Sequence, residues 1–206
     1  MAARGAGAFV VAQAFAVDDP AAELRAAAAI EGAGLPITAT HQVSGLYGLR
    51  ARARTSVVNA GILPRMMDVS SGTRLCVERL GIGASLMIMR SDGGVMDASR
   101  MASTPILTIL SGPAAGVSAA ILHQKLSNGL FIEVGGTSTD VSLILNGKPL
   151  RKNAVVGGHV LYLKTLDVRT VGGAGGSMAR VQGGKILDVG PRSAHIAGLE
   201  YSCFQD

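Results

Sequence analysis

One stretch of the sequence, residues 131–150 (FIEVGGTSTDVSLILNGKPL), limits most strongly what this chain can fold into. Two apolar runs flank the segment GGTSTD, and the dipeptide Asn146-Gly147 follows the second run. Short apolar runs bounded by turn residues are typical of strands, and Asn-Gly is the strongest short signal for a two-residue hairpin turn. The stretch therefore predicts three consecutive strands joined by turns, near residues 130–134, 141–145 and 148–151.

The GGTSTD segment is longer, and richer in hydrogen-bonding groups, than a reversal of chain direction requires. It supplies two glycines and three hydroxyl side chains: Gly135, Gly136, Thr137, Ser138 and Thr139. Glycines let consecutive backbone N–H groups approach an anion closely, and hydroxyls donate to phosphate oxygens. We therefore interpret the turn as a candidate phosphate cradle. An elaborate hairpin loop with solvated hydroxyls is an alternative that stays open.

Two carboxylates beside this turn are candidate metal ligands. Asp140 would supply an oxygen for Mg²⁺, directly or through water, and Glu133 could act as a second metal ligand or orient a water molecule. Carboxylates are rare in the second half of the chain, where residues 101–206 hold only Glu133, Asp140, Asp167, Asp188, Glu200 and Asp206. Three of these lie in or beside the two glycine-rich segments, which favours a site there.

The second glycine-rich segment, VGGAGGSMA, begins at residue 171. Bare backbone of this kind lets a flat ligand approach closely. We expect the nucleoside side of a nucleotide to lie against four residues of this segment: Gly173, Gly175, Gly176 and Ser177.

Three common motifs do not fit these two segments. The GGTSTD turn lacks the lysine of a P-loop and leads into a strand instead of a helix. It is not a nucleophile elbow, because Asp140 stands where that motif needs glycine. The second segment is not a dinucleotide fingerprint, since Met178 stands where the third glycine belongs. A Ser-His-Asp hydrolase stays open by composition, but no spacing selects one of the four histidines.

Hydrophobic periodicity and turn signals indicate the remaining elements. The expected strands are 8–16, 36–44, 85–89 and 105–110, the expected helices are 21–30, 55–80 and 114–126, and a last hairpin turns at 183–184. Pro64 is expected to bend or divide the second helix. We expect an α/β segment over residues 1–104, packed on a nucleotide-binding lobe over residues 105–206.

Composition narrows the fold class and the partners. Hydrophobic residues make up 48% of the 206 residues and charged residues 16%, which excludes a disordered chain. Because aromatic residues are scarce at 3%, the core must consist of aliphatic side chains, as in α/β proteins with buried strands. The net charge of +5 is spread along the chain, and no aromatic side chain is interleaved with the densest basic group, at residues 50–54. We therefore expect no nucleic-acid partner.

Three features of the sequence bear on where in the cell the protein is found. No apolar run is long enough to cross a bilayer. The first twenty residues mimic a signal peptide, but Gln13 interrupts the apolar stretch, and a buried strand is the favoured interpretation. Cys76 and Cys203 have no metal-binding spacing, and reduced thiols are the default in the cytoplasm. We therefore expect a cytoplasmic protein without a membrane partner.

The segment GGTSTDVSLI, preceded by Glu133 and Val134, resembles the DxGGTSTDV motif of the hydantoinase A/oxoprolinase family. The resemblance covers nearly the whole chain. Upstream it includes AFAVDDPAAEL, THQVSG, ARTSVVNAGILP, LMIMRSDGGVM and LTILSGPAAGVSAA. Downstream it includes DVRTVGGAGGSMARV, which is similar to the family's adenosine-side loop, and VGPRSAH.

This family belongs to the superfamily of actin, Hsp70 and sugar kinases. The resemblance implies an α/β fold with a ribonuclease H-like lobe, a mixed sheet and flanking helices. It also implies ATP and Mg²⁺ as cofactors and a small cyclic amide, such as a hydantoin or 5-oxoproline, as substrate. ATP would phosphorylate the ring amide oxygen, and water would then open the ring. A subunit of a related ATP-dependent carboxylase has the same motifs and stays open, and no residue stands out as the activating base.

The sequence departs from the family pattern in two places. Glu133 stands where the family usually has aspartate, which is one methylene shorter. The family's first lobe, with its own DxGGTxTD turn, has no counterpart, so we expect an incomplete lobe that is inactive without the missing first lobe or a partner subunit. The rival hypothesis is a non-catalytic nucleotide-binding or scaffold fragment.

Overall fold

The computed structural model describes residues 5–201. The chain divides into two compact units. Unit 1 comprises residues 1–111 and 151–165, and unit 2 comprises residues 112–150 and 166–206. The chain therefore leaves unit 2 once, between residues 150 and 166, to add a hairpin to unit 1.

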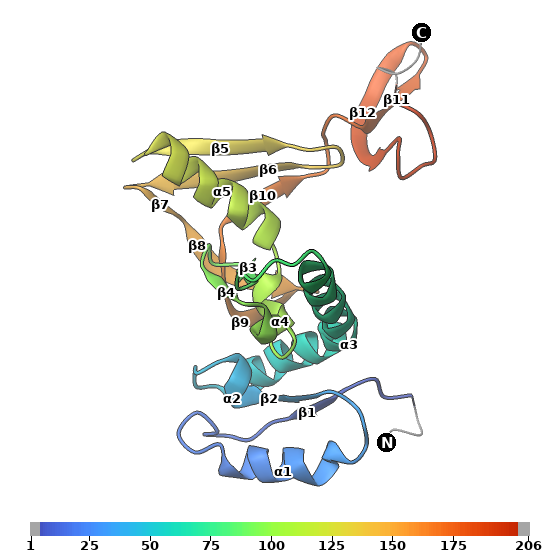
Figure 1. Ribbon diagram of the computed structural model, residues 1–206. Coiled ribbons are helices and arrows are strands. Elements are labelled where there is room, and N and C mark those ends of the chain that lie inside the picture. Colours follow the sequence, from blue (N-terminus) through green and yellow to red (C-terminus); the bar gives the residue numbers. More distant parts are fainter. Residues whose placement is uncertain (1–4, 202–206) are drawn as a thin grey trace. The chain divides into compact units, whose positions relative to one another are not determined.

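Unit 1 is an α/β unit in which the long helix α3 packs against β1, β2, α2, α4 and η2 (Figure 1). Its elements are β1 (Phe9–Val11), α1 (Ala21–Glu31), β2 (Ile37–Ala39), α2 (Thr40–Val43), α3 (Leu49–Arg79), β3 (Met87–Met89), β4 (Val95–Asp97), α4 (Ala98–Met101), η2 (Pro105–Thr108), β8 (Arg151–Val156) and β9 (His159–Leu166). Strands β1 and β2 pair in parallel, β3 and β4 are antiparallel, and β8 pairs with β9.

An aliphatic core holds these elements together. Ile106 of η2 is buried with Ala154, Leu161 and Leu163 of the β8–β9 hairpin, and partly buried side chains of α3 pack against them. Helix α3 continues through Pro64 as one helix of 31 residues, so the proline does not divide it.

The first two expected strands are shorter than predicted. Only residues 9–11 of the segment 8–16 form a strand, and the segment 36–44 leaves the extended conformation at Thr40, where α2 begins. The reason is tertiary, because the Thr40 hydroxyl and the His41 backbone N–H both donate to the carboxylate of Glu23.

The strand prediction for the segment 105–110 is wrong, because its residues Pro105–Thr108 form the 3₁₀ helix η2. Pro105 has no N–H to give to a sheet, and its fixed φ suits the first turn of a helix. The Thr108 hydroxyl donates to the Pro105 carbonyl at 2.8 Å, and the Ile106 N–H donates to the side-chain oxygen of Asn59 at 3.1 Å. These hydrogen bonds stabilise the helical turn, and they replace the inter-strand bonds that a strand would make.

Unit 2 contains a sheet with the order β10-β6-β5, in which β7 also pairs with β6 and all pairs are antiparallel. Its elements are α5 (Ser111–Gln124), β5 (Gly129–Val134), β6 (Thr139–Leu145), β7 (Lys148–Pro149), β10 (Val168–Val171), β11 (Ser177–Gln182) and β12 (Lys185–Ser193). The predicted turns at 146–147 and 183–184 are confirmed, and all four residues have positive φ, as type I′ hairpin turns require.

The two faces of this sheet differ. Helix α5 lies on one face (Figure 1), where Ala114 and Val117 pack with Ile144 and Val168 in a buried cluster. Because side chains alternate along a strand, the neighbours of these residues point to the opposite face. That face is apolar and at least 40% exposed at each of six side chains: Leu130, Ile132, Val134, Leu143, Leu145 and Val171.

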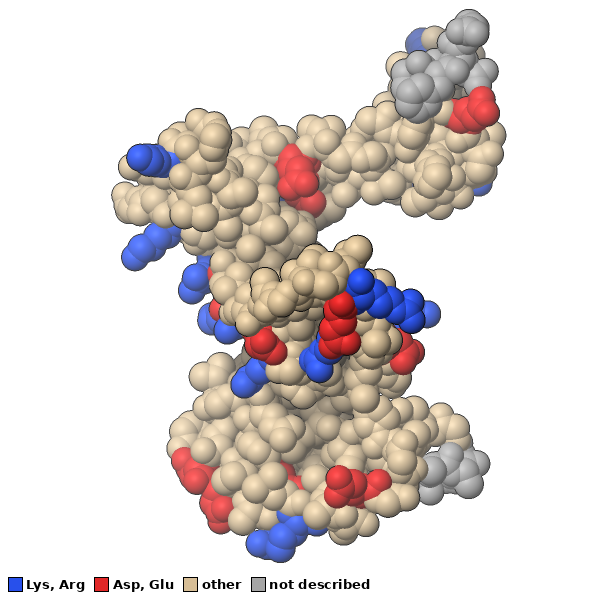
Figure 2. All heavy atoms as spheres, in the orientation of Figure 1, with Lys and Arg blue, Asp and Glu red and all other residues tan. Residues whose placement is uncertain are grey.

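The predicted lobe 105–206 differs from unit 2, because residues 105–111 and 151–165 belong to unit 1. Within the described residues, no helix is both long and apolar enough to cross a membrane. On the face shown in Figure 2, Lys and Arg side chains are dispersed among Asp and Glu and form no continuous patch. Cys76 is exposed and has a free thiol, while Cys203 lies outside the described residues.

Candidate nucleotide site

The two glycine-rich segments, which are about 35 residues apart in sequence, meet in unit 2. The backbone N–H groups of Gly175 and Gly176 donate to the carbonyls of Gly135 and Gly136, at 3.1 and 2.9 Å. The Thr139 hydroxyl adds a bond of 2.6 Å to the carbonyl of Gly173. The segments predicted to hold the phosphate and the nucleoside side are therefore parts of one loop pair.

Gly176 can be no other residue in this arrangement. It is buried, and a Cβ atom there would lie 2.6 Å from the carbonyl oxygen of Gly136 and 2.6 Å from the ring of Tyr201. Real Cβ contacts are not that short, so a side chain at this position would push the two loops apart. By contrast, a Cβ atom at Gly173 would meet nothing within 4 Å.

Several predicted ligand groups are used to build the loops. The Gly135 N–H donates to the Ser138 carbonyl at 3.0 Å, and the Ser177 hydroxyl accepts the Ala174 N–H at 2.8 Å, closing its own loop. Together with the bonds of Thr139, Gly175 and Gly176, these contacts fix the backbone without a ligand.

A smaller set of donors is left for a ligand. Within residues 5–201, the N–H groups of Gly136 and Thr137 and the hydroxyls of Thr137 and Ser138 have no hydrogen-bond partner. Gly136 and Thr137 are exposed, and Ser138 is half-buried. Consecutive backbone N–H groups without a partner can bind an anion. The phosphate cradle stays a prediction, now centred on residues 136–138.

Glu133 and Asp140 are directly opposite each other in β5 and β6, and Thr170 of β10 continues the same cross-strand row. Such partners lie on one face with Cβ atoms about 4.5–5.5 Å apart, where like charges repel. The Thr170 hydroxyl donates to Oδ1 of Asp140 at 2.5 Å, and no Lys or Arg of the described chain pairs with either carboxylate.

The metal role of these two carboxylates stays a prediction. Mg²⁺ is usually held by one or two protein carboxylates, with phosphate and water oxygens completing its shell. The described residues contain no cluster of three or more His, Cys, Asp or Glu side chains that could hold a metal, so the pair would need such outside oxygens.

Helix α5 makes room for Glu133. A Cβ atom at Gly116 would lie 2.6 Å from a carboxylate oxygen of Glu133 and 3.0 Å from the ring of Phe131. These residues border an open hollow of about 420 Å³ between α5 and β5. The sequence interpretation missed Gly116, Thr170 and Tyr201. The packing of α5 brings Gly116 to the site, the register of β10 brings Thr170, and the ring of Tyr201 packs against Gly176.

A family model described as Hydantoinase/oxoprolinase matches residues 52–206. The chain belongs to this family. The family resemblance of the sequence is thereby confirmed.

The hydantoinase/oxoprolinase relatives are longer than this chain. The caprolactamase subunit alpha of Pseudomonas jessenii is 29% identical over 187 residues, which are 87% of this chain and 27% of that protein. The acetophenone carboxylase gamma subunit of Aromatoleum aromaticum is 28% identical over 204 residues, 93% of this chain and 28% of that protein. The 5-oxoprolinase 1 of Arabidopsis thaliana is 32% identical over 147 residues. The chain thus spans between a quarter and a third of the first two proteins.

Two solved structures share the fold. Nucleotide-free acetone carboxylase matches with a TM-score of 0.74 and 25% identity, and the ATP-dependent caprolactamase of Pseudomonas jessenii matches with a TM-score of 0.71 and 26% identity. Each match covers 94% of this chain and less than a third of the other one. The predicted fold class, the α/β fold of this family, is confirmed.

Outside the loop pair, unit 1 contains a buried polar cluster that the sequence interpretation missed. The side chain of Glu23 is completely buried and accepts hydrogen bonds from the N–H of Gln13 at 2.8 Å, the Thr40 hydroxyl, the N–H of His41 at 3.1 Å and Nδ1 of His41 at 2.7 Å. The Arg52 guanidinium, also buried, donates to the Thr40 hydroxyl at 3.0 Å and to two backbone carbonyls. Thr40 therefore links the two opposite charges.

Burial alone would raise the pKa of Glu23, because it penalises the charged form. The hydrogen bonds from Thr40, His41 and Gln13 favour the carboxylate and outweigh burial, so the pKa of Glu23 lies below its ordinary value. Spacing along the sequence could not reveal the cluster, since its members come from α1, α2 and α3.

Proposed function

We propose that this chain is the nucleotide-binding part of a hydantoinase/oxoprolinase-type enzyme that uses ATP and Mg²⁺ to open a small cyclic amide. The observation that carries the proposal is the loop pair, in which four spare donors at residues 136–138 lie beside two carboxylates directly opposite each other. The names of the relatives support the reaction class, since they include a caprolactamase and 5-oxoprolinases.

Each group has a role that its geometry allows. The N–H groups of Gly136 and Thr137 would hold phosphate oxygens, assisted by the two spare hydroxyls. Asp140, oriented by Thr170, and Glu133 would hold Mg²⁺. The bare backbone of Gly173 and Gly175 would face the nucleoside side. ATP would supply the phosphoryl group that activates the ring amide oxygen toward water.

The proposed activity requires a second part of the enzyme beside this chain. Phosphoryl transfer depends on positioning and on charge stabilisation from several directions, and the described residues offer one loop pair. The exposed apolar face of the β5–β6–β10 sheet also needs a cover, because exposed aliphatic patches of this kind mark contact surfaces. We propose that another part of the enzyme, or a partner subunit, supplies both. A cytoplasmic location and the absence of nucleic-acid and membrane partners stay predictions.

A second candidate is supported by the similarity to the acetophenone carboxylase gamma subunit and to acetone carboxylase. In that case the same loop pair would bind ATP in a carboxylase subunit. A nucleotide-binding scaffold without turnover is the remaining rival, and nucleotide binding is common to all three.

The test is a calorimetric titration of ATP, with and without Mg²⁺, into the wild-type chain and two variants. Asp140→Asn keeps an oxygen that can accept from Thr170 but removes the charge, and Asp188→Asn changes an exposed carboxylate of the β11–β12 hairpin as the matched control. We expect Mg²⁺ to tighten ATP binding to the wild type and to the control, and Asp140→Asn to lose at least about tenfold of that gain. Equal, metal-independent affinities for all three proteins would rule out the metal role. Glu133→Asp should keep the gain, and Glu133→Gln should reduce it.

A further inference from the structure

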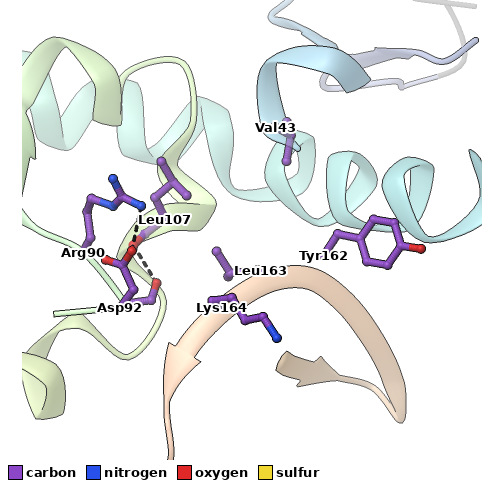
Figure 3. A pocket seen from close by; sticks show the side chains of 8 residues that line it. Val43, Arg90, Asp92, Leu107, Tyr162, Leu163 and Lys164 are labelled. Carbon is purple, nitrogen blue, oxygen red and sulfur yellow. Dashed lines mark hydrogen bonds and ion pairs between the residues drawn. The ribbon is translucent and has the colours of Figure 1, made fainter. Parts of the chain in front are cut away.

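A second hollow lies in unit 1, beside the turn that joins β3 to β4 (Figure 3). Its volume is about 240 Å³, below the range of about 300–1,000 Å³ that is typical of sites for drug-sized ligands. Val43, Leu107 and Leu163 line its apolar part and come from α2, η2 and β9. The hollow therefore suits a molecule of only a few heavy atoms with one apolar side.

The polar side of this hollow is a rigid turn, residues 90–94. Both the N–H and the hydroxyl of Ser91 donate to the Leu107 carbonyl, at 2.7 and 2.6 Å, which ties the turn to η2. The Arg90 N–H donates to the Gly94 carbonyl at 2.7 Å, and Gly93 has the positive φ that the turn requires. The backbone that carries the Arg90 side chain is therefore held in one position.

Arg90 is held in place but is far from saturated. Its Nη2 pairs with Oδ2 of Asp92 at 2.8 Å, and the other oxygen of Asp92 accepts the Gly94 N–H at 3.1 Å. A guanidinium has five N–H donors, and within residues 5–201 this pair is the one polar contact of the Arg90 side chain. Its Nε is buried without a partner, while 37% of the side chain is exposed.

Charge in the hollow is unbalanced. Arg90 and Lys164 carry two positive charges, and Asp92 carries one negative charge that Arg90 already engages. Lys164 is exposed and pairs with no carboxylate of the described chain. Tyr162 contributes its backbone, since its side chain points away from Arg90 toward Gly48. The Lys164 ammonium points away from Arg90 (Figure 3), so Lys164 adds positive charge at the edge of the hollow. One cation with spare donors and an apolar wall are complementary to a small anion with an apolar body.

We propose that this hollow binds a small monocarboxylate, whose carboxylate is anchored by Arg90 and attracted from a distance by the charge of Lys164, and whose body packs on Val43, Leu107 and Leu163. A planar carboxylate matches the fork of a guanidinium better than a spherical anion does. If the chain is part of a cyclic amide hydrolase, as proposed above, this hollow would indicate which class of cyclic amide the enzyme opens. The hollow suits a cyclic amide that carries a carboxylate, such as 5-oxoproline, because a lactam without a carboxylate would leave the spare donors of Arg90 without a partner.

The experiment titrates four probes separately into the isotope-labelled chain, and two-dimensional NMR spectra monitor each titration. The probes are 5-oxoproline, 2-pyrrolidone with the same ring but no carboxylate, acetate with no ring, and glutamate as the ring-opened form. We expect 5-oxoproline to shift resonances of residues 90–94 and to bind at least about tenfold more tightly than 2-pyrrolidone and acetate. A preference for glutamate would identify the product as the occupant and would overturn the assignment of the substrate class.

Two variants test the residues. Arg90→Gln should weaken 5-oxoproline binding by about ten- to a hundredfold, and Lys164→Gln should weaken it less, while Lys148→Gln in β7 is the control that changes nothing. Should Arg90→Gln fail to fold, Arg90→Lys keeps the charge, loses the fork and should still weaken binding. Wild-type affinity in both Arg90→Lys and Lys164→Gln, or equal binding of 2-pyrrolidone, would overturn the proposal. Asp140→Asn should leave this binding intact and Arg90→Gln should leave ATP binding intact, so failure of one site is distinguishable from failure of the other.

Discussion

Removing the carboxylate of Glu23 is the most direct test of how unit 1 is held together. In Glu23→Ala, the Arg52 guanidinium stays 1% exposed but loses the negative charge that Thr40 connects to it. The hydroxyl of Thr40, two backbone N–H groups and Nδ1 of His41 lose their acceptor as well. The change thus leaves one buried charge without compensation and several donors without partners.

The expected cost follows from these contacts. Glu23 and Arg52 are connected through the Thr40 hydroxyl and not by a direct ion pair, so we expect a cost of no more than the about 3–5 kcal/mol that removal of one partner from a buried pair typically causes. Small proteins are stable by only about 5–15 kcal/mol in total. Glu23→Ala should therefore remove a large part of the stability and lower the urea concentration at which the chain unfolds. Glu23→Gln keeps the shape and one oxygen acceptor, and we expect it to lose about 1–3 kcal/mol.

The same cluster predicts the direction of the pH dependence. The pKa of Glu23 is lowered in the folded chain, so the carboxylate binds protons less readily there than in the unfolded chain. Its contribution to stability is fully present above the pKa of an unfolded glutamate, about 4.3, and is lost as the pH falls through the lowered folded value. The difference between the wild type and Glu23→Gln should shrink over that acidic range.

Urea unfolding followed by far-ultraviolet circular dichroism, at neutral pH and at several acidic values, measures both effects. Glu31→Ala is the matched control, because Glu31 lies on the same helix α1 and is exposed. We expect it to change the free energy of unfolding by less than about 0.5 kcal/mol. A loss below about 1 kcal/mol in Glu23→Ala, or a difference from Glu23→Gln that is independent of pH, would refute the reasoning.

Two further predictions concern the loop pair. Gly176→Ala should separate the two loops, lower the melting temperature and abolish ATP binding. Gly173→Ala should keep the wild-type melting temperature, because its Cβ atom meets nothing within 4 Å. Thermal unfolding of both variants and an ATP titration of Gly176→Ala check this, and equal melting temperatures of the two variants would contradict it. The chain by itself should show no ATPase stimulated by hydantoin or 5-oxoproline above background, since losing even one preorganised donor typically costs on the order of a hundredfold in rate. Steady-state turnover by the isolated chain would refute the proposed need for further polypeptide.

The features that the sequence predicts well are those with local causes. Asn146-Gly147 and Gly183-Gly184 form their turns because glycine and asparagine tolerate the positive φ that a tight hairpin needs. The GGTSTD segment lies between β5 and β6 as expected, since apolar runs on both sides set the strands. The family resemblance is likewise a property of the order of residues, and the family match confirms it.

Other features depend on contacts between residues that are distant in sequence. The segment 105–110 has a strand-like composition, yet Asn59, 47 positions upstream, accepts the Ile106 N–H and fixes a helical turn. In the same way, β6 extends to Thr139 and Asp140, two residues earlier than predicted, because Val171 and Thr170 of β10 pair with them.

By itself, then, the sequence determined the turns, the longer helices, the family and the two segments from which a nucleotide site could be built. Only the tertiary structure decided which groups of those segments are left for a ligand, because hydrogen bonds between the loops use the N–H groups of Gly175 and Gly176 and leave those of Gly136 and Thr137. It also placed Glu133 opposite Asp140, since strand register sets which carboxylates become neighbours. The buried link from Glu23 to Arg52 has the same origin: charges from different helices meet only when the helices pack.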